Sequence, residues 1–202
     1  MKVALVGATG MVGSRLLAEL ASRGHAVTAI VRHPEKVPIF SNVVARAGDV
    51  LDQAGLAALL AGHDAAISAV RFTASDPGKL IAAAKAARVG RYLVVGGAGS
   101  LEVAPGVRLF DTPEFPPAYL PEAKAGGVFL DLLREEADLD WTYLSPSAVI
   151  APGARTGAFR LGGDQLLVRD AASRISAEDF AVALVDELET PAHSRRRFTV
   201  GY

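Results

Sequence analysis

Apolar and polar positions divide the chain into two kinds of segment that take turns along its length. Short continuous apolar runs are typical of strands buried on both faces, and longer segments with apolar residues three and four apart are typical of amphipathic helices. The runs predict strands at Val3–Val6, Ala26–Val31, Val43–Ala47, Ala65–Val70, Arg91–Val95, Trp141–Leu144 and Arg197–Val200. The longer segments predict helices at Ser14–Arg23, Leu56–Leu60, Pro77–Arg88, Glu122–Ala137 and Ala177–Glu189.

Regular alternation of strands and helices predicts an α/β fold with a Rossmann-like, doubly wound parallel sheet. With 202 residues, half of them hydrophobic, residues 1–202 are expected to form one domain with a small C-terminal insertion or hairpin. Right-handed crossovers then place any ligand at the carboxyl ends of the strands.

Composition removes several classes of function. A net charge of −1 gives no general attraction to nucleic acid or anionic membrane, and the basic run Arg195–Arg197 is interpreted as a solvated strand entry. The absence of cysteine excludes disulfides and thiolate metal sites, and the histidines lack metal-ligand spacing. No apolar run approaches the roughly 18 residues of a membrane span, and no signal-peptide pattern opens the chain. We expect a cytoplasmic protein.

A glycine-spaced turn follows the first strand and opens the first helix. It consists of Gly7, Ala8, Thr9, Gly10, Met11, Val12 and Gly13. Gly7 allows a sharp turn, Gly10 leaves room for phosphate oxygens, and Gly13 allows the helix to pack closely on the strand. The helix beginning near Met11 directs unpaired N–H groups at an anion. The turn therefore predicts a dinucleotide pyrophosphate site, with an ordinary tight turn as the alternative.

Arg32 ends the second strand, where an acidic residue would bind the ribose 2′-hydroxyl of NAD. A guanidinium favours a 2′-phosphate instead, so we expect NADP(H) to be preferred, with NAD(H) as a possible second cofactor. His33 offers a second donor when it is protonated. The alternative is that Arg32 stacks on the adenine or is solvated.

The next two strand ends carry weaker candidates. Asp49 and Val50 stand where an adenine ring would pass, and a simple turn aspartate is an equally good interpretation of Asp49. Ala69 and Val70 are small enough to let the adenosine-side ribose and phosphates lie against the backbone. Arg71 either reaches a phosphate or points to solvent.

Beyond these positions the chain resembles a known family. GATGMVGSRL, AIVRHPEK, GDVLD, VVGGAGSLEV, WTYLSPSAV, RTGAFRLGGDQLL and SRISAEDFAVALVDELE resemble the atypical short-chain dehydrogenase/reductases. Within that superfamily they are most similar to the NAD(P)H-binding NADH-flavin reductase group, which is related to NmrA-like proteins and biliverdin-IXβ/flavin reductase. The resemblance implies that Gly96 and Gly97 lie under the nicotinamide ribose. It also implies that Ser145, Pro146 and Ser147 lie beside the nicotinamide.

One departure from the superfamily bears on the reaction. Members that reduce carbonyls carry Tyr-x-x-x-Lys, and no tyrosine of this chain has a lysine four residues later. A flavin or quinone acceptor needs no strongly activated protein acid, since the protein has only to hold nicotinamide and acceptor together. Ser100 is then the candidate catalytic residue, as a hydroxyl donor to the acceptor. A turn or N-cap serine is the alternative.

Two segments are expected to form the acceptor pocket: residues 97–121, rich in proline and aromatics, and residues 152–168, rich in glycine. Both could instead form a dimer surface, so a monomer and a homodimer stay open. The expected partner is a small-molecule hydride acceptor, with flavin as a possible substrate.

Two other functions are compatible with parts of the pattern. An NmrA-like redox sensor would bind NADP(H) without turnover, and the missing tyrosine–lysine pair fits it equally well. A sugar-nucleotide epimerase or dehydratase is disfavoured, because the C-terminal part is too short for a sugar-binding domain and the proton-transfer tyrosine is missing.

Overall fold

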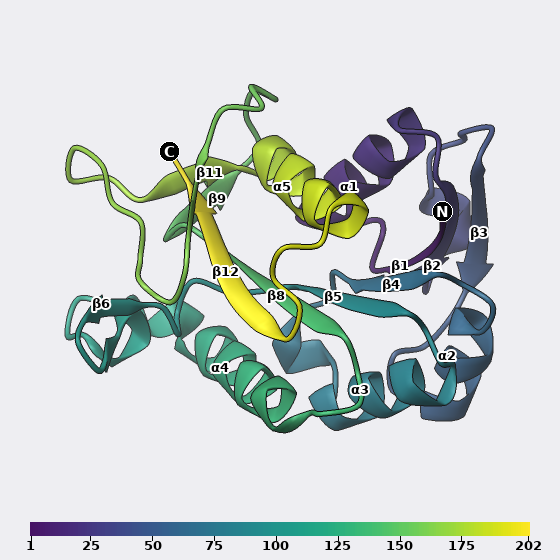
Figure 1. Ribbon diagram of the computed structural model, residues 1–202, viewed down its shortest axis with the longest axis horizontal. Coiled ribbons are helices and arrows are strands. Elements are labelled where there is room, and N and C mark those ends of the chain that lie inside the picture. Colours follow the sequence, from purple (N-terminus) through teal and green to yellow (C-terminus); the bar gives the residue numbers. More distant parts are fainter.

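The computed structural model describes residues 1–202, which form one layered α/β unit around an eight-stranded sheet (Figure 1). The strand order is β10-β12-β8-β5-β4-β1-β2-β3, and all neighbours are parallel except the β10–β12 pair. The strands are β1 (Lys2–Val6), β2 (Ala26–Val31), β3 (Val43–Ala47), β4 (Ala65–Ser68), β5 (Arg91–Val95), β8 (Trp141–Pro146), β10 (Arg160–Gly162) and β12 (Arg196–Gly201). The predicted doubly wound fold is confirmed.

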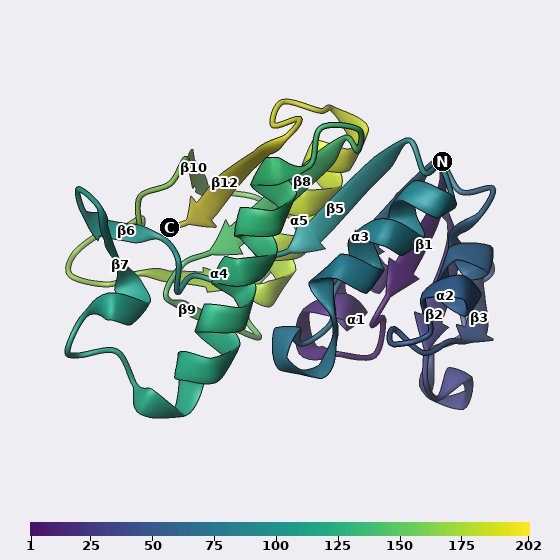
Figure 2. The same ribbon diagram turned by 90° about the horizontal axis from the view of Figure 1, so that it is seen from below.

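Helices cover both faces of this sheet (Figures 1 and 2). One face carries α1 (Met11–Ser22) and α5 (Ala177–Glu189), and the other carries α2 (Gln53–Leu60), α3 (Pro77–Ala86) and α4 (Leu120–Glu135). Because side chains alternate along a strand, β1 buries Val3 and Leu5 in the first core and Ala4 and Val6 in the second. No helix has the length and apolar character needed to cross a membrane.

Capping side chains explain where most helices begin. Asp76 accepts from the Lys79 amide at 3.1 Å and caps α3, which begins at the predicted Pro77. Asp52 accepts from the Gly55 amide and starts α2 three residues before the predicted Leu56. Ser176 caps α5 by accepting from the Asp179 amide at 2.9 Å. By contrast, α1 starts at Gly10 without any side-chain cap.

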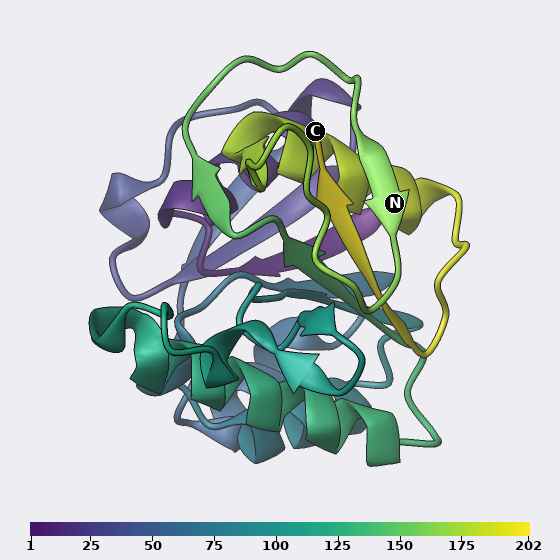
Figure 3. The ribbon, with the colours of Figure 1, turned by 90° about the vertical axis from the view of Figure 1, so that its left-hand side faces the viewer.

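Short elements decorate the end of the sheet where β10 and β12 lie (Figure 3). They are the ribbon β6 (Glu102–Ala104) and β7 (Val107–Arg108) and the parallel pair β9 (Val149–Ala151) and β11 (Arg174–Ser176). The 3-10 turns of the chain are η1 (Pro34–Lys36), which lies beside β2 and β3, η2 (Phe72–Ala74), which packs against α4, η3 (Leu109–Asp111) and η4 (Pro117–Tyr119). The C-terminal insertion pairs with the main sheet rather than within itself, because β10 sets Leu161 opposite Val200 of β12.

A strap of residues 152–158 is fastened to the amino end of α5 by a buried carboxylate. Asp179 accepts from the amides of Thr156 (2.7 Å) and Gly157 (2.8 Å) and from the hydroxyls of Thr156 (2.6 Å) and Tyr202 (2.7 Å). Burial alone would raise the pKa of Asp179, but the hydrogen bonds from Thr156, Gly157 and Tyr202 outweigh it and hold the pKa below its usual value.

We expect Asp179→Asn to lower the free energy of unfolding by about 2–3 kcal/mol at neutral pH, because an amide cannot accept all four hydrogen bonds. A carboxyl group whose pKa is lowered on folding stabilises the folded state at pH values above its unfolded-state pKa. That stabilisation is lost as the pH falls through its folded-state pKa. The difference between wild type and variant in urea unfolding should therefore shrink in acid. Glu135→Gln, an exposed carboxylate on α4, is the control. A pH-independent difference would contradict this assignment.

Candidate functional site

The candidate site lies at the carboxyl ends of the strands, where the chain order reverses. β1 sits between β2 and β4, so successive connections leave it on opposite sides and open a crevice at that edge. In Figure 2 the arrowheads of β1 and β5 end on the same side of the sheet. The predicted residues after β1, β2, β4, β5 and β8 therefore share one edge.

Two of the three glycines after β1 are required by the fold itself. Gly7 has φ +87°, and a Cβ there would lie 2.5 Å from the Ala69 carbonyl oxygen. A Cβ on Gly13 would lie 2.1 Å from the Gly7 carbonyl oxygen. A Cβ on Gly10, however, would approach nothing closer than 3.5 Å. The protein's own packing does not need glycine at position 10, so its bare backbone is available to a ligand.

The amino end of α1 presents main-chain donors that no group of the protein uses. The amides of Met11, Val12 and Gly13 donate to no group of the protein, and Gly10 provides no side-chain cap. No acidic side chain occupies the first turn, and Thr9, Gly10 and Met11 are exposed while Ala8 is buried beneath them. These amides and the helix dipole fit the pyrophosphate of a dinucleotide.

At the end of β2, Arg32 is exposed and forms no ion pair or side-chain hydrogen bond. Its neighbour His33 faces Glu35, with Nδ1 3.2 Å from Oε1. After β3, one carboxylate oxygen of Asp49 accepts from the Leu51 amide at 2.9 Å, which is the turn interaction that the sequence left open. Val50 packs on the core beneath α2. Of these residues, Arg32 alone presents an unpartnered charged group.

The loop after β4 is clasped to α4 by Glu122. Its carboxylate accepts from the Phe72 amide (2.7 Å), the Thr73 amide (3.0 Å) and the Thr73 hydroxyl (2.6 Å). Burial opposes ionisation, but these bonds and the charge of Arg71 hold the pKa of Glu122 below its usual value. Ala69 and Val70 pack against Gly7, and Arg71 is exposed without an ion pair. The clasp fixes this loop between the glycine turn and β5.

Gly96 and Gly97 are held from below by Tyr143 of β8. The Tyr143 hydroxyl accepts from the Gly97 amide and donates to the Gly126 carbonyl, both at 3.1 Å. A Cβ on Gly96 would lie 2.2 Å from the tyrosine ring. The ring of Phe72 stacks with the Tyr143 ring at a centroid distance of 6.3 Å. Ser145 donates to the Gly97 carbonyl at 3.0 Å, so the ends of β5 and β8 are tied together.

The remaining residues after β8 are buried. Pro146 and Ser147 are inaccessible, and the Ser147 hydroxyl donates to the Val200 carbonyl at 3.0 Å. The hydroxyls of both serines are thus used on main-chain carbonyls, and neither side chain is exposed. Their first role in this structure is to hold the strand ends in place.

Ser100 is buried and accepts a hydrogen bond from Arg197 at 3.0 Å. The expectation that Arg195–Arg197 forms a solvated strand entry is wrong for Arg197, whose side chain is 3% exposed and paired with Asp164. β10 covers β12 on its outer side, so Arg197 stands in an inner strand. Arg195 and Arg196 are exposed, as expected.

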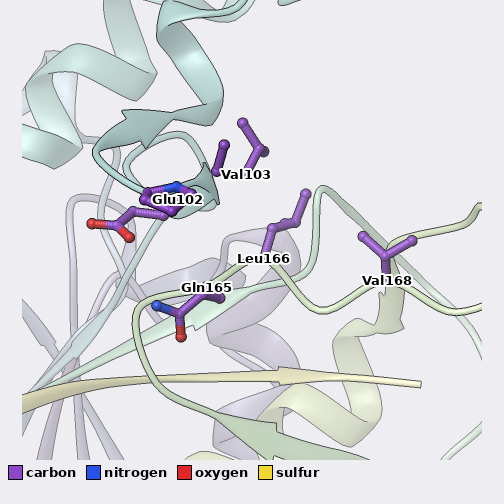
Figure 4. A pocket seen from close by; sticks show the side chains of 7 residues that line it. Glu102, Val103, Gln165, Leu166 and Val168 are labelled. Atoms are coloured by element: carbon purple, nitrogen blue, oxygen red, sulfur yellow. The ribbon is translucent and has the colours of Figure 1, made fainter.

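A hollow of about 420 Å³ lies between the two segments named above as walls of an acceptor pocket. Its lining residues are Glu102, Val103, Ala104, Pro105, Gln165, Leu166 and Val168. The walls are paired, since the Glu102 amide donates to the Asp164 carbonyl and the Leu166 amide to the Glu102 carbonyl. In Figure 4, Val103, Leu166 and Val168 surround the open space, and the Glu102 carboxylate points away from it. The walls are therefore mostly apolar.

The sequence missed three residues of this region: Glu122, Tyr143 and Arg197. Each contacts a partner distant in the chain, from 46 to 97 residues away. Strand alternation places Arg197 on the face opposite Phe198 and Val200, but no local pattern shows that this face is covered.

A doubly wound sheet with an open helix amino end at its switch point defines a dinucleotide-binding protein. The family model described as NAD(P)H-binding matches residues 7–191, and the chain belongs to this NAD(P)H-binding family. It is 42% identical to the uncharacterized protein YwnB of Bacillus subtilis (strain 168), over 99% of this chain and 98% of that one.

Solved structures agree with this assignment. A Bacteroides thetaiotaomicron protein, named "putative epimerase", is 44% identical with a TM-score of 0.95, over 100% of this chain and 96% of its own. A Streptococcus pneumoniae TIGR4 protein, named "putative NADH-flavin reductase", is 36% identical with a TM-score of 0.83, over 100% and 99%. The resemblance to the atypical short-chain dehydrogenase/reductases is thereby supported.

Proposed function

We propose that this protein is an NADPH-dependent reductase that passes hydride to a flavin or a quinone-type acceptor. One observation carries the proposal: the free main-chain amides at the amino end of α1 fit a dinucleotide pyrophosphate, and the chain lacks the tyrosine–lysine pair of a carbonyl reductase. The name of the Streptococcus pneumoniae relative supports the same reaction. The proposal includes a cytoplasmic location, where NADPH is kept reduced.

Different residues at this edge of the sheet would bind different parts of the cofactor. The amides of Met11, Val12 and Gly13 would hold the pyrophosphate, and Arg32 the 2′-phosphate. Gly96 and Gly97 would lie under the nicotinamide ribose. The bound nicotinamide supplies the hydride. Residues 97–104 and 163–168 exclude water and orient a planar acceptor, so that catalysis rests on proximity and orientation.

The tyrosines do not supply the acid of a carbonyl reductase or an epimerase. Burial raises the pKa values of Tyr92 and Tyr143, and both rings lie within the core. Tyr202 donates to Asp179, and Tyr119 stands just before α4, five residues from Lys124. A flavin or quinone can take its proton from solvent, which suits this set of residues better than sugar-nucleotide epimerisation.

The test is steady-state consumption of NADPH with riboflavin, FMN, FAD and a simple quinone, with NADH in parallel. We expect saturation in the acceptor and a lower KM for NADPH than for NADH. Tight NADP(H) binding without turnover by any acceptor would reject the reductase in favour of a redox sensor of the NmrA-like kind.

Arg32→Ala is expected to weaken NADPH binding about tenfold to a hundredfold and to leave NADH binding unchanged, since it removes a charge-assisted hydrogen bond worth about 1.5–3 kcal/mol. Isothermal titration with both cofactors measures the two dissociation constants. Arg196→Ala removes an equally exposed arginine at the opposite end of the sheet and is the control. An unchanged ratio of the two constants in Arg32→Ala would remove Arg32 from the 2′-phosphate site.

A further inference from the structure

Arg197 is a buried cation whose contacts lead toward the candidate acceptor site. Its Nε donates to the Asp164 carboxylate at 2.7 Å, and Nη2 donates to the same carboxylate. Its Nη1 donates to the Ser100 hydroxyl oxygen at 3.0 Å. One guanidinium thus joins β12, the loop after β5 and the segment after β10.

A buried charge is costly, and replacing a buried ion pair with apolar side chains is often neutral or stabilising. Asp164 pairs with this charge from a half-exposed position and also accepts from Arg134 at 3.0 Å. The Nη1 group, however, is directed at a neutral hydroxyl that Arg197 does not need for charge compensation. This arrangement favours a role at Ser100 over a purely structural one.

The Ser100 hydroxyl has one proton left to donate. Its oxygen accepts from Arg197, and its own O–H donates to no group of the protein. A hydrogen bond accepted from a cation polarises the hydroxyl and makes it a better donor. Along the chain, Ser100 stands between Gly97, which Tyr143 and Ser145 fix, and Glu102, which opens the wall of the hollow.

We propose that Arg197 is a positioning residue for the reductase: it fixes the Ser100 hydroxyl with its proton free for the acceptor. This inference rests on the proposed function. In the reaction the acceptor gains a hydride and one negative charge, and the oxidised cofactor is the other product. The Ser100 hydroxyl donates a hydrogen bond to that charge and keeps its proton, and solvent later protonates the acceptor. Arg197 acts through Ser100 and does not touch the acceptor.

The test is a double-mutant cycle of Ser100→Ala, Arg197→Met and the double variant, read as kcat with a saturating flavin or quinone. We expect each single variant to lose about tenfold to a hundredfold in kcat, as for loss of one donor to developing charge. The double variant should be no slower than the slower single variant, because both remove the same donor. The NADPH dissociation constant should stay within about twofold of wild type in all three. Arg196→Met, on the same strand and exposed, is the control.

Three results would overturn the inference while leaving the reductase intact. The first is a fold-loss of kcat in the double variant equal to the product of the two single losses. The others are an undiminished kcat in Arg197→Met and a loss of kcat in that variant accompanied by losses of NADPH affinity and Tm. Where Arg197→Met does not fold, Arg197→Lys keeps the charge and loses the forked geometry, and the same cycle with Ser100→Ala applies. Absence of wild-type turnover with every acceptor is the failure of the proposed function, and the inference then falls with it.

Discussion

Gly13→Ala is expected to lower the free energy of unfolding by about 3–5 kcal/mol, at the upper end for a single overpacking substitution. The new Cβ would lie 2.1 Å from the Gly7 carbonyl oxygen and 2.9 Å from its carbonyl carbon. Both are main-chain atoms between β1 and α1, so no flexible side chain can move aside. Either α1 is pushed from the sheet or the turn after β1 is distorted.

Urea unfolding followed by far-UV circular dichroism measures this change. Gly62→Ala is not a suitable control, because Gly62 has φ +78°. Gly163→Ala is suitable, because a Cβ there meets nothing within 4 Å. A Gly13→Ala protein as stable as Gly163→Ala would contradict the close packing of α1 on β1.

Gly10→Ala is expected to do the opposite: to keep the fold and to weaken NADPH binding by about a hundredfold, which corresponds to roughly 2.7 kcal/mol. Gly10 has φ −73° and ψ 172°, a conformation that alanine adopts without strain, and a Cβ there has ordinary contacts. The methyl group would instead project from the cap of α1, beside the three free amides that would hold the pyrophosphate.

The measurement is NADPH titration of Gly10→Ala, paired with its urea unfolding curve. Stability within about 1 kcal/mol of wild type together with lost affinity would assign Gly10 to the ligand. Unchanged affinity would show that the pyrophosphate does not approach this backbone, and the crevice would need another occupant. Of these two glycines, Gly13 would then be required for folding and Gly10 for binding of the cofactor.

Local spacing was sufficient for much of the fold. The strands and helices follow from apolar periodicity, and Asp76 and Ser176 cap their helices because a cap needs only the next three residues. The glycine turn could be predicted for the same reason, because its residues are close together in the sequence. The start of α2 before Leu56 was missed, since Asp52 lies ahead of the apolar pattern.

Contacts between distant segments were not readable. The Glu122 clasp and the Arg197–Ser100 bond depend on how loops return to the sheet, which no local pattern encodes. Arg197 was expected to be solvated because it belongs to a basic run before a short apolar strand, whereas Asp164 and Ser100, both distant in the chain, bind its side chain. The hollow likewise depends on the pairing of Glu102 with Asp164 and Leu166.

The most direct measurement is an anaerobic single turnover, in which protein loaded with NADPH is mixed with riboflavin or FMN. The proposed function predicts that the absorbance of the reduced nicotinamide and that of the oxidised flavin fall together, with one rate constant and equal stoichiometry. That rate should exceed the rate without protein and saturate with flavin. Bound NADPH that stays reduced, with flavin consumed no faster than in buffer, would contradict hydride transfer by this protein.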